Sequence, residues 1–183
     1  MKHQFAILAS AAALALSVAT PASAQIYTFN SVLTGAAEAP PVTTTAGGSI
    51  LVTFNTQAST VSVTEFFFGL SSGLSDNHIH CCTTTPLTGT VGVALGFTGL
   101  PLGSTSGSYS NTFTLAPAAF TSLLNGSLSG KAYANVHTTT NPSGEIRGFL
   151  QLVSVNPVPE PATYALLFSG LAAIGFVARR RQS

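Results

Sequence analysis

Charge is the scarcest property of this 183-residue chain. Only 6% of its residues are charged, where an ordinary globular domain has about a quarter. Between residues 25 and 157, four acidic side chains stand against two basic ones, a net charge of −2, and no basic patch exists. Nucleic acids and anionic membrane surfaces require such a patch, so the composition argues against both. Ser, Thr, Asn and Gly must form the wet surface, which favours neutral partners such as glycans or copies of the same protein.

Cysteine is almost absent, because Cys81 and Cys82 are the only two and they are adjacent. They therefore exclude an ordinary intramolecular disulfide across the fold. Three arrangements remain: a vicinal disulfide, an intermolecular bridge, or thiolates that join nearby histidines around a soft metal ion. In an oxidising compartment we favour the vicinal disulfide, although adjacent Cα atoms lie only about 3.8 Å apart, against roughly 5.5 Å in ordinary bridges.

Familiar catalytic motifs are also missing. The chain contains no Ser-His-Asp order, no Gly-rich phosphate loop and no paired carboxylates with a plausible cleft. Glu145 and Arg147 lie two residues apart on a predicted strand, and hence on one face. We expect a structural role for them, either as a pair or in fixing the loop that holds His137. The sequence thus predicts a protein that is not an enzyme.

Short strands separated by turn residues fill the middle of the chain. Apolar residues alternate along several segments, as they do in half-buried strands. One helix is expected, beginning near Pro117 and stopping at Gly126. The pattern predicts an all-β fold: a single antiparallel β-sandwich or Greek-key barrel with one short helix, over residues 25–157. The expected strands include 27–33, 50–54, 61–68, 91–95, 109–115, 131–138 and 145–153.

Both ends of the chain carry export signals. Residues 1–24 have a basic start, an Ala-rich apolar run and an Ala-Ser-Ala cleavage site, which is typical of a signal peptide cut before Gln25. At the other end, Val158, Pro159, Glu160 and Pro161 precede an uncharged apolar run over 162–178, and the cluster Arg179, Arg180 and Arg181 follows it. Seventeen helical residues span roughly 25 Å, so we expect a transmembrane helix with the arginines on the cytoplasmic side.

Histidines supply the candidate chemistry. His78 and His80 lie on one face of a predicted strand, and His137 ends another strand. Two such imidazoles joined by a third form a common metal site, and neutral imidazole suits Cu or Zn. Cys81 or Cys82 could complete the ligand set as thiolates. The alternative is that the histidines bind loop backbones and organise the strand ends.

Three blocks of sequence resemble one known family. They begin with Leu33-Thr34-Gly35-Ala36-Ala37-Glu38-Ala39-Pro40-Pro41-Val42, continue with Asn77-His78-Ile79-His80, and end with two segments over 132–138 and 142–148. Together they resemble the chordin-type (CHRD) domain, which implies an extracellular β domain. Residues 158–183 are similar to a PEP-CTERM sorting signal, which implies recognition by an exosortase-type membrane peptidase in a Gram-negative bacterium that makes extracellular polysaccharide.

Two functions follow as hypotheses. The first is a non-catalytic, exported module of the cell surface or extracellular matrix, held transiently at the inner membrane and interacting with exopolysaccharide or other surface proteins. The second is a metal-binding or copper-redox domain that uses His78, His80 and His137.

Overall fold

The computed structural model describes residues 24–158 and 161–180, with the side chains of 161–163 and 177 left out. The predicted signal peptide, 1–24, lies outside the described residues apart from Ala24. Pro159, Glu160 and Arg181 lie outside them as well. The first strand begins at Gln25, the residue expected to follow signal-peptide cleavage.

The described chain folds mainly as antiparallel strands, as the sequence predicted. Two α-helices and a single 3-10 turn, η1 (Gly35–Ala37), accompany the strands. The helices are α1 (Pro117–Leu128) and α2 (Pro161–Arg180). The strands are β1 (Gln25–Thr34), β2 (Gly47–Asn55), β3 (Thr60–Phe68), β4 (Leu74–His80), β5 (Val93–Gly96), β6 (Gly107–Thr114), β7 (Tyr133–Thr138), β8 (Ile146–Phe149) and β9 (Gln151–Pro157).

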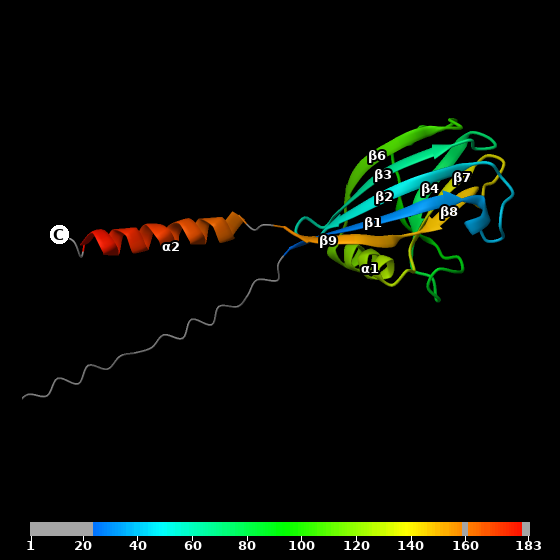
Figure 1. Cartoon of the computed structure of the whole chain (residues 1–183). Coiled ribbons are helices and arrows are strands. Elements are labelled where there is room, and N and C mark those ends of the chain that lie inside the picture. The colour runs from blue at the N-terminus through cyan, green and yellow to red at the C-terminus, as the bar shows by residue number, and fades with distance from the viewer. Residues whose placement is uncertain (1–23, 159–160, 181–183) are drawn as a thin grey trace, which may run out of the picture.

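One continuous sheet curls to make both layers of the sandwich (Figure 1). Its order is β5-β4-β7-β8-β1-β2-β3-β6, and β9 pairs with the first half of β1. The layer of β1, β2, β3 and β6 is therefore joined to the layer of β4, β5, β7 and β8 through the β1–β8 pairing at Thr34 and Arg147. The expected antiparallel sandwich is confirmed, with its two layers hydrogen-bonded along one edge.

The core forms because apolar residues alternate along the strands. In β3, Val61, Val63 and Phe67 are fully buried, while Ser62, Thr64 and Phe66 face outward. The free edges of the sheet meet through aromatic packing, where Phe97 stacks on Tyr109 with ring centroids 5.2 Å apart. This contact closes the sandwich on the side away from the β1–β8 pairing.

Two predicted boundaries shift in the structure. Helix α1 begins at Pro117 as expected but continues past Gly126 to Leu128. Two backbone hydrogen bonds close the end of the helix: the N–H of Lys131 donates to the Gly126 carbonyl, and the N–H of Gly130 donates to the Ser127 carbonyl. Gly130 has a φ of 65°, so this glycine, and not Gly126, terminates the helix. The strand expected over 91–95 is the shorter β5.

The C-terminal segment is helical, as predicted, and α2 extends away from the β domain in Figure 1. None of the helices in the part of the chain that the structure describes is both long and apolar enough to cross a membrane. This differs from the transmembrane helix expected over 162–178.

Candidate metal centre

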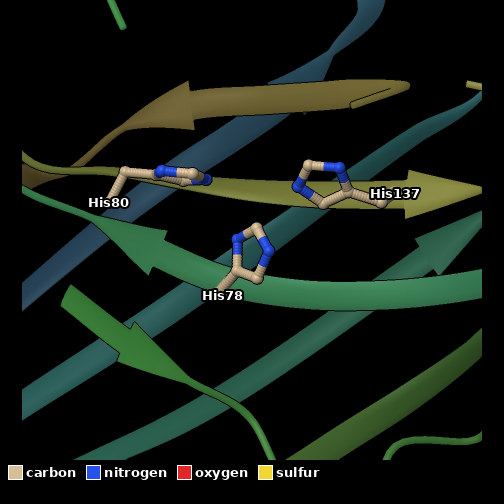
Figure 2. A group of neighbouring side chains, drawn as sticks. All are labelled: His78, His80 and His137. Carbon is tan, nitrogen blue, oxygen red and sulfur yellow. The ribbon is translucent and has the colours of Figure 1, made fainter. Parts of the chain in front are cut away.

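Three histidines meet on the outer face of two neighbouring strands. His78 and His80 come from β4, and His137 comes from β7, which pairs with β4. One nitrogen of each imidazole lies within 4.8 Å of the other two. Figure 2 shows His80 and His137 pointing toward one another from opposite sides, with His78 entering between them from a third direction. The predicted histidine cluster is therefore present as a geometric unit.

Loops cover this face and bury all three side chains. The loop before β5 contributes the Val91 carbonyl to His80, and the loop after β7 contributes the Pro142 carbonyl to His137. Each histidine is less than a tenth exposed. The three imidazoles are thus covered by loops, although the strand pattern alone would leave them facing solvent.

Each hydrogen-bond partner fixes which ring nitrogen carries the proton. His80 Nδ1 lies 2.6 Å from Val91 O, and His137 Nδ1 lies 3.0 Å from Pro142 O. A carbonyl oxygen only accepts, so both Nδ1 atoms are donors and both Nε2 atoms keep a lone pair. The Nε2 of His78 faces an Asp76 carboxylate oxygen at 3.5 Å, which leaves its lone pair on Nδ1.

The three ring nitrogens that keep a lone pair have no hydrogen-bond partner. His78 Nδ1, His80 Nε2 and His137 Nε2 are buried and make no hydrogen bond. Buried polar atoms normally have a hydrogen-bond partner, so three buried nitrogens without one in a single cluster require an explanation. A metal ion fits the pattern, because metal-bound histidines typically donate their other N–H to a carbonyl or carboxylate.

Burial also keeps these imidazoles neutral. It lowers the pKa of His78 to about 4, helped by the nearby imidazoles of His137 and His80. It lowers the pKa of His80 and of His137 as well, although their backbone hydrogen bonds oppose it. Neutral imidazole is the form that binds metal, so protons compete weakly for this cluster near neutral pH.

Tyr133 and Arg147 form the wall beside His80. The His80 ring stacks on Tyr133 with centroids 4.6 Å apart, and the Arg147 guanidinium lies 4.9 Å from the centre of the Tyr133 ring. Arg147 donates to the Ala37 and Gly89 carbonyls and lies 3.8 Å from Glu38. The segment after β1 and the loop before β5 are therefore both held to β8 by the Arg147 side chain.

Glu145 and Arg147 do not form the ion pair that was one expectation. Glu145 is fully buried and accepts hydrogen bonds from Thr44 Oγ1, the backbone and hydroxyl of Ser71, and Thr138 Oγ1. Thr138 follows His137 and in turn accepts from the Asn141 N–H. Of the two, Glu145 contacts the segment after His137 through Thr138, whereas Arg147 binds the segment after β1 and the loop before β5. A role of the pair in fixing the loop near His137 stays a prediction.

Cys81 and Cys82 are bonded to one another as a vicinal disulfide, the arrangement that we favoured. Neither sulfur is then a free thiolate that could join the histidines. The mixed set of cysteine and histidine ligands that the sequence also allowed does not form in this structure. Both sulfur atoms lie against Gly126 of α1, where a Cβ atom would collide with them. The disulfide is therefore packed under the helix.

Sequence reasoning missed Glu65, Asn77 and Glu38. Glu65 occupies an inward position of β3 between Val63 and Phe67, and it is 1% exposed. The signal was available, because the two-residue alternation of β3 places Glu65 on the core face. Glu38 reaches Arg147 only through the loop after β1, which no strand pattern predicts.

The chemistry of the cluster is that of three neutral nitrogen ligands. Imidazole donors suit Zn, Cu and other late first-row metals, whereas Ca and Mg prefer oxygen ligands. Within the described residues, His78, His80 and His137 form the group with ligand atoms close enough to share an ion.

Comparison with known proteins agrees with both resemblances. Residues 157–181 match the PEP-CTERM protein-sorting motif, which implies sorting by an exosortase system, export and membrane-anchored processing. No curated protein and no solved structure matches the chain. Residues 29–150 match the CHRD domain, and they make up more than half of the sequence, so the chain belongs to the CHRD domain family.

Proposed function

We propose that this protein is an exported, non-catalytic surface module whose CHRD domain binds copper or zinc through His78, His80 and His137. The observation that carries the metal-binding part is the cluster of three buried imidazoles: one nitrogen of each lies within 4.8 Å of the other two, and each ring has a buried nitrogen without a hydrogen-bond partner. Hydrogen bonding to loop backbones, the alternative role for these histidines, accounts for only one nitrogen each of His80 and His137.

Removing one imidazole tests the site. We expect the purified exported protein to bind one Cu or Zn ion per chain, and His80→Ala to lower the affinity by at least 100-fold. Metal content by mass spectrometry and binding by calorimetry measure this. Thr112→Ala, an exposed change on β6 in the opposite layer, is the matched control. Equal metal content in His80→Ala and the parent protein would exclude the site.

The exported surface role rests on a different feature, the outer face of the layer opposite the histidines. The outward side chains of β2, β3 and β6 carry no charge in the described chain. Phe66 and Phe68 are half exposed there with ring centroids 5.9 Å apart, beside a groove of about 370 Å³. Hydroxyls and aromatic rings without charge favour a neutral partner, so we propose exopolysaccharide or a neighbouring surface protein of a Gram-negative cell.

Fractionation of cells tests this role. We expect the mature domain to remain in the surface polymer after washing, and we expect its mass to lack the segment after the Val158–Pro161 motif because an exosortase-type peptidase has removed it. Intact mass spectrometry of the washed fraction measures both. A chain that still ends at Ser183 would mean permanent anchoring, and a domain with no affinity for the polymer would contradict the matrix role.

A further inference from the structure

The three imidazole rings are arranged unequally. The centroid of the His78 ring lies 4.6 Å from that of His80 and 4.4 Å from that of His137, whereas the centroids of His80 and His137 are 6.3 Å apart. These separations form a triangle that is close to right-angled at His78. Figure 2 shows the same relation, with two rings opposed and the third between them.

Metal coordination geometry predicts different triangles for different ions. With a metal–nitrogen bond of about 2.0 Å, an imidazole centre lies roughly 3 Å from the metal. Three ligands of a tetrahedral ion then have centroids all roughly 5 Å apart. Three ligands of a tetragonal ion have two separations of roughly 4.5 Å and one of roughly 6 Å across the metal. The rings of this protein match the tetragonal set.

The nitrogen positions are consistent with that arrangement. The ligand nitrogens span at most 4.8 Å, and two nitrogens opposed across an ion would be about 4 Å apart. Rotation of the His80 and His137 rings closes the gap between these nitrogens by less than about 1 Å and keeps the ring centroids near their observed separation. Because the Val91 and Pro142 carbonyls hold their rings by Nδ1, this closure keeps the same nitrogens directed at the ion.

We infer that the site is built for copper(II) in a T-shaped arrangement, with His80 and His137 opposed and His78 between them, and not for tetrahedral zinc. The inference rests on the proposed metal-binding function and names its ion. Tetragonal geometry with nitrogen donors is typical of Cu(II) and Ni(II), and Cu(II) binds more tightly than Ni(II) to such a donor set. The fourth position of a tetragonal ion would be filled by water or another small donor.

Electron paramagnetic resonance of the full exported protein titrated with Cu(II) tests the geometry. We expect one copper per chain, an axial spectrum with a large copper hyperfine splitting, and further splitting from imidazole nitrogens. His78→Ala should bind at least 10-fold more weakly and change the nitrogen pattern, while Thr112→Ala should leave both unchanged. Cobalt(II) is the second probe, and we expect the weak visible absorption of a site that is not tetrahedral.

The outcomes separate this inference from the proposed function. Stoichiometric binding with an intense tetrahedral cobalt spectrum, and a small copper splitting, would overturn the copper geometry while leaving a metal site. Binding of neither copper nor zinc in a protein that retains its β-sheet circular dichroism would overturn the proposed metal-binding function, and the inference with it. An axial copper spectrum that loses nitrogen couplings in each of the three histidine variants supports both.

Discussion

Replacing Glu65 by glutamine is expected to stabilise the domain at pH 8 by about 3 kcal/mol and to change its stability little at pH 5. Glu65 is 1% exposed, and burial raises its pKa from 4.5 to about 7 even though Asn77 donates to it at 2.6 Å. Its Oε2 and the Oδ1 of Asn77 are buried acceptors without partners. A proton on the carboxyl turns one acceptor into a donor, so the neutral acid suits this core better than the anion.

The sign follows from the direction of that shift. A carboxyl whose pKa is higher in the folded state contributes stability that is fully present below 4.5 and is lost as the pH rises through about 7. Glutamine keeps a donor and an acceptor at this position without a titratable proton. The variant should therefore follow the parent protein at low pH and exceed it above pH 7.

Urea unfolding from pH 5 to pH 9 measures this difference. Burial also raises the pKa of Glu38 to about 7, against the opposing charge of Arg147 and a backbone hydrogen bond. The parent protein alone would therefore mix the titrations of Glu65, Glu38 and the three buried histidines, and the difference between parent and variant isolates Glu65. A constant stability gap across this range would show that Glu65 is charged throughout.

Replacing Glu145 by glutamine is expected to have the opposite effect, a loss of about 3 kcal/mol at neutral pH. The Glu145 carboxylate accepts from Thr44, Ser71 and Thr138, and these hydrogen bonds outweigh burial, so its pKa is lowered. The NH2 group of a glutamine at this position cannot accept a hydrogen bond. Some of the N–H and O–H groups that donate to Glu145 would therefore lose their acceptor. Glu145→Gln should also loosen the loop beside His137, because the Thr138 hydroxyl donates to Glu145 and accepts from the Asn141 N–H in that loop.

The pH dependence of this second variant distinguishes it from the first. A carboxyl with a lowered pKa contributes stability above 4.5 that is lost as the pH falls through its folded value. The deficit of Glu145→Gln should therefore be largest near pH 7 and shrink in acid. The same urea series, extended down to pH 3, measures it, with Glu65→Gln as the matched buried control. A deficit that stays constant down to pH 3 would mean that the lost charge is not the cause.

Strand alternation was sufficient to predict the β class, because burial on one face of a sheet imposes a period of two wherever the sheet forms. Val61, Val63 and Phe67 repeat at that period and are fully buried in β3. The same rule placed His78 and His80 together on one face of β4. Local rules of this kind need only neighbouring residues, so the sequence carries them directly.

Pairings between distant segments did not follow from any local pattern. The position of His137 beside His78 depends on β4 pairing with β7 across more than fifty residues, which spacing along the chain could not predict. Arg147 finds Glu38 instead of Glu145 because the loop after β1 folds over β8. Such contacts depend on the register of the whole sheet.

The sequence by itself determined the periodic strands, the sorting motif at the C-terminal end, and the residue types available to a metal. Tertiary structure alone decided that loops bury the three imidazoles, that carbonyls fix their tautomers, and that their rings form a right-angled triangle. The physical reason is that alternation depends on each residue and its near neighbours. Desolvation and ligand geometry depend instead on atoms that the curled sheet and its loops bring in from far along the chain.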